Sequence, residues 1–300
     1  MEFKEKLKLY SAFADKTVCS YLPKADEMRS TIIESSDYSV VNGGKRLRPI
    51  MMMLSYQLIK GKTDELPGEE DMEILGPFMA ALEMIHSSSL VHDDLPCMDN
   101  DTLRRGKPST WAKFGEDMGT LAGDALLLYA FETAAKSKAK PSLSLNAMKV
   151  LAEKSGIYGM VGGQTLDVEL TGRKPTRDQL VFIYENKTGA LIEAAFMIGA
   201  ILAGAGKRQT ESLRKSALDI GMAFQIRDDI LDVTSTEAEL GKPIGSDSEI
   251  GKVTWLTVFG MAKSEKDVAK YTERAVKTVE KLGGHEFFEE LLRYLVTRNN

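Results

Sequence analysis

The 300-residue sequence contains only two cysteines, Cys19 and Cys97. Two thiols cannot build a disulfide framework, and they are too few for a thiolate metal site. The sequence also lacks a strong charge imbalance, because 39 basic side chains stand against 44 acidic ones and the net charge is −5. We therefore expect no nucleic-acid partner, so local pairs of basic residues must be explained by local anions.

Long apolar runs without charged or small residues are missing as well. The most apolar run, residues 188–206, contains Glu193 and many alanines and glycines. These features are typical of a tightly packed core helix and not of a lipid-facing span. The first seven residues carry too many charges for a signal peptide. We expect a cytoplasmic protein without stable membrane anchoring.

Convincing strand alternation and hairpin signals are absent too. Apolar residues instead recur at helical spacing, as at Leu75, Met79, Leu82 and Ile85. No segment has the composition of a flexible interdomain linker, so residues 1–300 are expected to form a single all-α domain. The predicted helices cover residues 1–41 (two helices broken near Pro23), 50–60, 72–94, 121–136, 145–158, 179–205, 211–232, 252–259, 266–282 and 286–296.

An acidic cluster follows the predicted helix 72–94. Its four carboxylates lie within nine positions, at Asp93, Asp94, Asp99 and Asp101. Pro96 disfavours helix at the residue before it, so the carboxylates emerge where the helix ends. Carboxylates this close repel one another. A hard divalent cation such as Mg²⁺ or Ca²⁺ between them would offset that repulsion, because such cations prefer oxygen ligands. An isolated aspartate pair is more often part of a solvated turn. Whether this cluster is a metal site or such a turn therefore depends on features elsewhere in the chain.

A second acidic cluster contains Asp228, Asp229 and Asp232. Asp228 and Asp232 are four residues apart on one predicted helix and share a face. Apolar neighbours make a purely solvated face less favourable. Two aspartate-rich helix ends in one helical protein indicate a multi-metal cluster completed by an anionic ligand.

Basic residues gather beside both acidic clusters. Arginine suits bidentate binding of phosphate, while lysine acts as a movable point charge. This arrangement predicts diphosphate ligands held by Mg²⁺ and cations together. In chain order the basic residues are Lys45, Arg46, Arg48, Arg104, Arg105, Lys107, Lys187, Lys242 and Lys252.

These segments resemble the trans-polyprenyl diphosphate synthase family, especially its short-chain farnesyl and geranylgeranyl type. The resemblance covers residues 40–260 and implies an all-α bundle around a central hydrophobic cavity. It also implies a homodimer whose other partners are small-molecule isoprenoid diphosphates. The matching segments, in family order, are Gly43–Pro49, Asp93-Asp94-x4-Asp99, Arg104–Pro108, Gly162–Asp167, Lys187–Gly189, Phe224–Asp232 and Gly241-Lys242.

The resemblance also implies roles in a condensation that begins with Mg²⁺-assisted ionisation of an allylic diphosphate and ends with elimination of a proton. The implied ligands of several Mg²⁺ ions are Asp93, Asp99 and Asp228, with Asp94, Asp229 and Asp232 as auxiliary ligands. Isopentenyl diphosphate would be held by Gly44, Lys45, Arg48, His86 and Arg105, over which Arg298 could close. The allylic diphosphate would be held by Arg104, Lys187, Thr188, Gln225 and Lys242. Catalytic roles fall on Arg104, Lys187, Thr188 and Gln225.

Product length is expected to depend on the wall of a hydrophobic tube. Ser88 and Ser89 lie about one helical turn, roughly 5.4 Å, before Asp93. Family members that stop early resemble one another in carrying an aromatic side chain at one or both positions. Two serines favour geranylgeranyl diphosphate (C20), with farnesyl diphosphate (C15) as the alternative. Ile85, or Met118 or Leu121 from a neighbouring helix, could still close the tube, and the serines could merely allow close helix packing.

Three other functions can be weighed against this one. A terpene cyclase needs no isopentenyl site, so the segment 43–49 and Arg104-Arg105 speak against it. A di-iron bundle could use Glu83-x-x-His86, but it needs a second such pair. A non-catalytic regulatory homologue would be expected to have lost one acidic motif, and both are present here.

Overall fold

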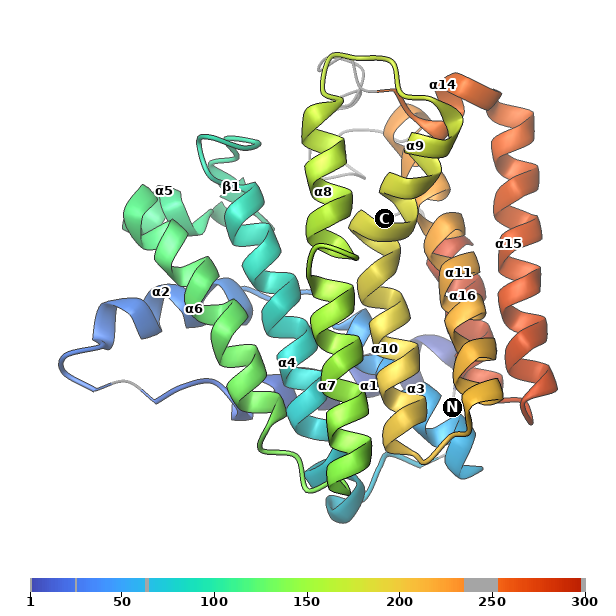
Figure 1. Cartoon of the computed structure of the whole chain (residues 1–300), viewed down its shortest axis with the longest axis horizontal. Coiled ribbons are helices and arrows are strands. Elements are labelled where there is room, and N and C mark those ends of the chain that lie inside the picture. The colour runs from blue at the N-terminus through green and yellow to red at the C-terminus, as the bar shows by residue number, and fades with distance from the viewer. Residues whose placement is uncertain (1, 25, 63–64, 235–252, 298–300) are drawn as a thin grey trace. The chain divides into compact units, whose positions relative to one another are not determined.

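The structure, a computed structural model, describes residues 2–24, 26–62, 65–234 and 253–297 (Figure 1). In these ranges nearly all regular structure is helical, and the only strands are β1 (Leu103–Arg104) and β2 (Lys107–Pro108). The predicted all-α class is confirmed.

The chain divides into two compact units. Unit 1 consists of Met1–Met53 and Leu66–Met148, and unit 2 consists of Leu54–Glu65 and Lys149–Asn300. Because each unit is compact in its own right, the single domain stays a prediction.

Unit 1 is built around helix α4 (Glu69–Asp93), whose side chains Leu75, Phe78 and Leu82 are completely buried. Helices α6 (Glu116–Ala134), α1 (Phe3–Ser20) and α2 (Ser30–Val41) pack against it. The unit also contains the start of α3 (Leu47–Lys60), the short helix α5 (Thr110–Phe114) and the start of α7 (Pro141–Ser155). The predicted break near Pro23 is confirmed, because α1 ends at Ser20 and α2 begins at Ser30.

Two glycines let α6 approach the end of α4 that carries the first acidic cluster. A Cβ atom at Gly123 would lie 2.8 Å from Cε1 of His92 and closer still to Nε2. A Cβ atom at Gly119, one turn earlier, would lie 3.1 Å from Cδ2 of Leu95, just after α4, and 2.9 Å from Cβ of Trp111 on α5. The contact between these helices therefore depends on the absence of side chains at both positions.

Helix α4 is also the one helix among the described residues that is long and apolar enough to cross a membrane. Its most apolar 18-residue window is 78% buried inside the protein. Such burial is typical of the central helix of a packed core.

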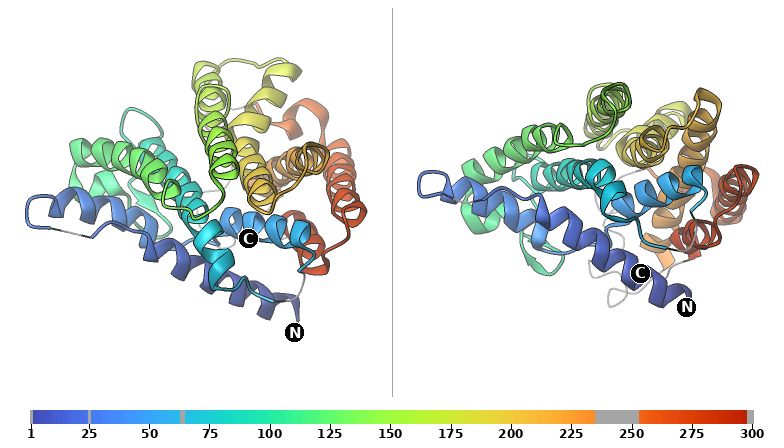
Figure 2. Two further views of the ribbon diagram at one scale, coloured as in Figure 1. Left: turned by 60° about the horizontal axis from the view of Figure 1, so that its bottom comes forward. Right: turned by 90° about the horizontal axis from the view of Figure 1, so that it is seen from below.

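Unit 2 is organised around α11 (Lys207–Thr234), which packs against α10 (Gly189–Leu202) and α15 (Met261–Lys281). Figure 2 shows these three helices side by side in both views. Helix α10 is buried along almost its whole length, which confirms the core helix expected in the apolar run 188–206. The remaining elements are α8 (Met160–Glu169), α9 (Arg177–Ile183), the π-helix η1 (Tyr184–Thr188), α14 (Trp255–Phe259) and α16 (Glu286–Thr297).

Four sequence predictions of local structure were wrong. The short hairpin β1–β2 and the helices α5 and α8 were not expected, and the single helix predicted over 179–205 is divided by η1. Helix α8 was missed because Gly162 and Gly163 lower helix propensity. The predicted loop 235–251, with Gly241 and Lys242, lies outside the described residues, as do Lys252 and Arg298.

Candidate functional site

The first acidic cluster is shaped by a tight turn at the end of α4. The backbone N–H of Asp99 donates to the carbonyl of Asp93 at 2.9 Å, and that of Met98 donates to Leu95 at 2.8 Å. Asn100 closes the turn with a positive φ of 55°. The turn therefore brings Asp99 back beside Asp93, although five residues separate them. Asp93 is half-buried and Asp99 is exposed, so both carboxylates lie near the surface of unit 1.

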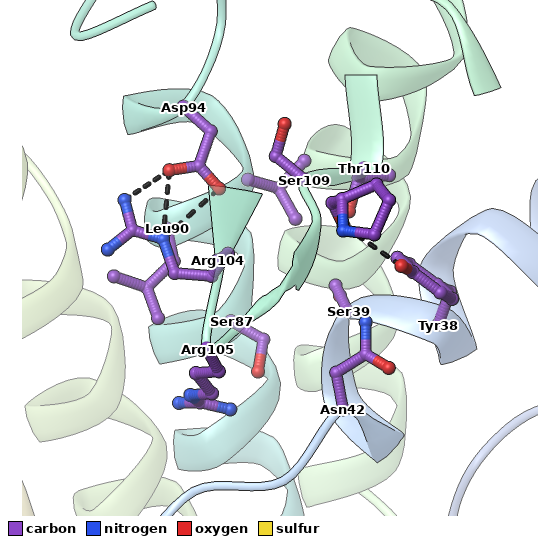
Figure 3. A pocket seen from close by; sticks show the side chains of 12 residues that line it. Tyr38, Ser39, Asn42, Ser87, Leu90, Asp94, Arg104, Arg105, Ser109 and Thr110 are labelled. Carbon is purple, nitrogen blue, oxygen red and sulfur yellow. Dashed lines mark hydrogen bonds and ion pairs between the residues drawn. The ribbon is translucent and has the colours of Figure 1, made fainter. Parts of the chain in front are cut away.

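Asp94 differs from its neighbours because it is buried and paired. Nε of Arg104 donates to its Oδ1 at 2.9 Å, and Nη2 of Arg104 donates to the same oxygen (Figure 3). Burial raises the pKa of Asp94, and the adjacent guanidinium opposes that rise. Arg104 also contacts Asp101 at 3.2 Å. Asp94, predicted to bind metal, and Arg104, predicted to bind the allylic diphosphate, thus bind each other in this structure.

The hairpin β1–β2 sets the direction of the two arginines. Arg105 and Gly106 both have positive φ, 54° and 75°, which is the turn geometry that suits two-residue hairpins. Tyr38 Oη donates to the Pro108 carbonyl at 2.9 Å, and Lys107 Nζ donates to Asn42 Oδ1 at 3.1 Å. These bonds tie the hairpin to the end of α2.

Arg105 lies against the glycine turn 43–44. Its Nη1 donates to the carbonyl of Gly43. A Cβ atom at Gly44, whose φ is 134°, would lie 2.9 Å from Nη2 of Arg105. Gly44 is therefore required by both its backbone angle and this close approach.

The structure gathers Arg48, His86 and Arg105 in unit 1, as expected for an anion site. Burial lowers the pKa of His86 well below its ordinary value, and the charges of Arg48 and Arg105 lower it further. His86 is therefore neutral at pH 7 and can donate one N–H. Burial also lowers the pKa of Arg48, and the charge of Arg105 adds to that. Lys45, the third predicted cation of this site, is exposed and lies three residues before Arg48 in the sequence.

Arg46 does not belong with these cations, so its grouping with the anion-binding residues was wrong. It is 2% exposed and its guanidinium binds Glu83, Asp15 and the carbonyl of Val40. Sequence reasoning had considered Glu83 only as an iron ligand.

A pocket behind the hairpin adjoins this cluster. Figure 3 shows side chains from α2, α4 and the hairpin around it, among them Ser39, Ser87 and Arg105. The hydroxyls of Ser87 and Ser109 are buried there without a hydrogen-bond partner among the described residues.

The serines expected to control product length lie on α4, one turn before Asp93. Ser88 is 3% exposed and donates to the carbonyl of Ile85 at 3.0 Å, while half-buried Ser89 donates to that of His86 at 2.8 Å. Both hydroxyls are satisfied within the helix, so neither projects far from it. Ile85 is completely buried, whereas Leu121 on α6 is 49% exposed.

In unit 2 the π-helix η1 presents two predicted site residues in succession. Lys187 Nζ donates to Asp167 at 2.6 Å, and the Thr188 hydroxyl donates to Gln225 Oε1 at 2.7 Å. Helix α8 meets η1 at Gly163, where a Cβ atom would lie 2.7 Å from the carbonyl carbon of Asn186. π-Helical turns of this kind often occur at functional sites.

The second acidic cluster lies on the last turns of α11, so the predicted shared face of Asp228 and Asp232 is confirmed. Asp229 is 3% exposed and accepts hydrogen bonds from Tyr184 Oη at 2.5 Å and from the Trp255 backbone N–H at 2.9 Å. Asp228 is half-buried and Asp232 is 5% exposed. Sequence reasoning missed Tyr184 and Trp255, whose roles arise only from packing.

The carboxylates fit a magnesium ion in part. Mg²⁺ prefers oxygen ligands and usually takes one or two carboxylates together with substrate phosphates. Asp93 and Asp99 at the turn of unit 1 supply such a pair. Within the described part of the chain, no three His, Cys, Asp or Glu side chains form a complete metal site. Substrate phosphate oxygens and water would supply further ligands.

Comparison with known proteins agrees with this chemistry. The family model for polyprenyl synthetase matches residues 29–291. Geranylgeranyl diphosphate synthase of Cyanophora paradoxa is 44% identical over 251 residues, which cover 83% of this chain and 81% of that protein. Farnesyl diphosphate synthase of Geobacillus stearothermophilus is 42% identical over 241 residues, 79% of this chain and 78% of the relative.

A solved structure extends the likeness to the fold. It is a geranyltransferase from Helicobacter pylori complexed with magnesium and isoprenyl diphosphate, with a TM-score of 0.81 and 28% identity over 98% of this chain and 96% of that one. The family model, these relatives and the shared helical fold therefore show a prenyltransferase enzyme of the short-chain type. The chain belongs to the polyprenyl synthetase family.

Proposed function

We propose that the enzyme condenses isopentenyl diphosphate with the allylic substrates dimethylallyl, geranyl and farnesyl diphosphate, and that its main product is geranylgeranyl diphosphate. The layout of α4 carries this proposal. His86 lies seven residues before Asp93 on one continuous helix, so the two are about 10.5 Å apart along its axis. Cationic side chains gather at the level of His86, and carboxylates gather at the level of Asp93. This arrangement suits two diphosphates, of which the first binds directly to the cations and the second binds to the carboxylates through metal ions.

Isopentenyl diphosphate is assigned to Gly44, Lys45, Arg48, His86 and Arg105. The two guanidiniums can each bind phosphate oxygens in a bidentate manner, and Lys45 adds a movable charge. Neutral His86 contributes an N–H without adding a fourth charge to a crowded cluster. The absence of a side chain at Gly44 leaves room for Arg105.

Magnesium is assigned to Asp93 and Asp99 in unit 1 and, on the same chemical ground, to Asp228 in unit 2, because each offers the carboxylate oxygen that this ion prefers. When bound, Mg²⁺ supplies positive charge that stabilises the diphosphate leaving group. Asp94 accepts a hydrogen bond from Arg104, and Asp229 accepts one from Tyr184. Both act as auxiliary carboxylates that orient these partner side chains. Asp232 is the third auxiliary carboxylate.

The remaining residues act on the allylic substrate. Arg104, Lys187 and Lys242 bind its diphosphate as the C–O bond breaks and an allylic cation forms. The isopentenyl double bond then attacks that cation to form the new C–C bond, and the released diphosphate accepts the proton that is lost. Thr188 and Gln225, already oriented by their mutual hydrogen bond, face the cation with fixed dipoles, as does the Lys187 carbonyl.

Geranylgeranyl diphosphate is favoured over farnesyl diphosphate because Ser88 and Ser89 are small. One turn of helix spans about the length of one isoprene unit, so an open wall at this level admits a longer product. The farnesyl alternative is supported by the 42% identity to a farnesyl diphosphate synthase.

We also propose a homodimer. Leu121 and Leu128, two turns apart on α6, are 49% and 71% exposed, and an apolar stripe of this kind suits a second copy of the chain. Light scattering coupled to gel filtration tests it, since a mass near twice 33.1 kDa is expected.

The metal assignment is tested by Asp93→Asn, assayed with isopentenyl and geranyl diphosphates and Mg²⁺. We expect turnover to fall by about 100-fold or more, because one oxygen ligand loses its charge. Circular dichroism should be unchanged. Glu132→Gln, which removes an exposed carboxylate from α6 of the same unit, should keep wild-type turnover. Chelation with EDTA should stop the wild-type reaction, and near-normal turnover of Asp93→Asn would disprove the assignment.

A further inference from the structure

The segment from Gly43 to Arg48 has a backbone that needs external support. Gly43, Gly44 and Arg46 have φ angles of 92°, 134° and 49°. Glycine adopts positive φ readily, but an arginine does so only when its surroundings hold it there. Arg46 stands between Lys45 and Arg48, so the support of this one residue decides where both of those cations lie.

Arg46 is held by three separate parts of unit 1. Its Nε donates to Asp15 on α1 at 2.8 Å, its Nη1 to Glu83 on α4 at 2.9 Å, and its Nη2 to the Val40 carbonyl at 2.6 Å. The side chain is 1% exposed. Such a planar fork with three anchored nitrogens fixes both the position and the orientation of the residue that carries it.

Glu83 is the buried counter-charge at this point. It is 2% exposed and lies three residues before His86, on the same face of α4. Burial alone would lower the pKa of Arg46, but the adjacent carboxylates of Glu83 and Asp15 outweigh it and leave that pKa raised. The charge of Glu83 also opposes the burial that lowers the pKa values of Arg48 and Arg105. One carboxylate therefore acts on three guanidiniums.

We propose that Arg46 and Glu83 are a positioning pair for the isopentenyl diphosphate site, an inference that rests on the function proposed above. Arg46 fixes the backbone between Lys45 and Arg48. Glu83 offsets the repulsion among the neighbouring guanidiniums, which keeps Arg48 and Arg105 close before the substrate arrives. Neither residue touches the substrate. The site is therefore organised in advance, and binding need not order these side chains.

The test is Glu83→Gln, which keeps the shape of the side chain and removes its charge. We expect the KM for isopentenyl diphosphate to rise about tenfold, as for loss of one charge-assisted hydrogen bond. The kcat and the KM for geranyl diphosphate should stay within about twofold, because the allylic site is untouched. Arg46→Lys, which keeps the charge but loses the planar fork, should raise the same KM by a smaller factor.

Glu193→Gln is the matched control. Glu193 is 3% exposed and pairs with Lys154 at 3.0 Å and Arg214 at 3.4 Å in unit 2. Glu193 is therefore as deeply buried as Glu83 and is likewise paired with cationic side chains, but it has no proposed role in substrate binding. This variant should lower the melting temperature about as much as Glu83→Gln does, and it should leave the KM for isopentenyl diphosphate unchanged.

The outcomes separate the pair from the proposed function. If the wild type turns over but Glu83→Gln leaves the KM for isopentenyl diphosphate unchanged, or raises both KM values equally, the pair is only structural and the inference is wrong. If Glu83→Gln fails to fold, Arg46→Lys provides the test instead. A rise in its KM for isopentenyl diphosphate without an equal rise in its KM for geranyl diphosphate supports the inference, and equal or unchanged values contradict it. If the wild type forms no product, the proposed function fails, and calorimetric titration of isopentenyl diphosphate into both proteins still tests the pair.

Discussion

Gly163→Ala is a small chemical change for which the structure predicts a large effect on both stability and turnover. Alanine is the better helix former by about 1 kcal/mol, so propensity alone would stabilise α8. However, the new Cβ atom would lie 2.7 Å from the Asn186 carbonyl carbon and closer still to the Lys187 backbone nitrogen. Both are backbone atoms of η1, so no side chain can turn away to relieve the overlap.

An ordinary contact to a Cβ atom is 3.4 Å or more, so α8 and η1 must separate by roughly 1 Å. Overpacking of this kind costs about 1–3 kcal/mol of unfolding free energy. The separation also displaces Lys187 and Thr188, and a misplacement of about 1 Å can cost up to about 100-fold in rate. We expect kcat to fall towards that limit and the melting temperature to fall by several degrees.

The assay is steady-state turnover of isopentenyl and geranyl diphosphates together with thermal unfolding of each variant. Gly206→Ala serves as the control, because the nearest atom to a Cβ there is Gln209 Oε1 at 3.9 Å. Its stability should change by no more than about 0.5 kcal/mol. Wild-type turnover and stability of Gly163→Ala would refute the idea that this glycine sets the position of η1.

Two further predictions concern α4 and α2. Ser88→Phe should shorten the main product, because an aromatic ring narrows the tube one turn before Asp93; an unchanged product profile by mass spectrometry would place the floor elsewhere. Burial raises the pKa of Asp37 from 3.8 to about 6, so the folded chain binds this proton more tightly than the unfolded chain and loses stability as pH rises from about 4 to 6. Asp37→Asn should therefore be more stable than the wild type at pH 8 by about 1 kcal/mol, once solvent screening is allowed for, and no more stable at pH 4. Equal gains at both pH values by chemical denaturation would contradict this linkage.

The positions of the site residues could be predicted from sequence where short-range geometry decides them. Asp228 and Asp232 share a face because four residues complete about one turn of α11. The acidic cluster at Asp93 follows directly from the helix end before Pro96. These relations hold whatever the rest of the chain does, so a single sequence is enough to find them.

Partners that are distant in sequence could not be predicted in the same way. Arg46 stands among the cations of a glycine turn, yet its guanidinium is buried against Asp15 and Glu83. No helix or strand period applies in a segment with three positive φ angles, so the direction of that side chain depends on packing. The contact of Asp229 with Tyr184 and Trp255 has the same origin, because 45 residues separate the carboxylate from the tyrosine.

The local errors have a physical reason as well. The hairpin was missed because its turn uses Arg105-Gly106 and not the Asn-Gly or Asp-Gly pair that favours this geometry. Helix α8 was missed because two glycines interrupt its pattern, and one of them, Gly163, is required by the approach of η1.

The most direct test of the proposed function is the product that the purified chain makes from isopentenyl diphosphate, dimethylallyl diphosphate and Mg²⁺. Mass spectrometry of the products should show geranylgeranyl diphosphate as the main species, with none formed after EDTA treatment. A main product of farnesyl diphosphate would contradict the role given to Ser88 and Ser89, and the absence of any condensation product would contradict the proposed function.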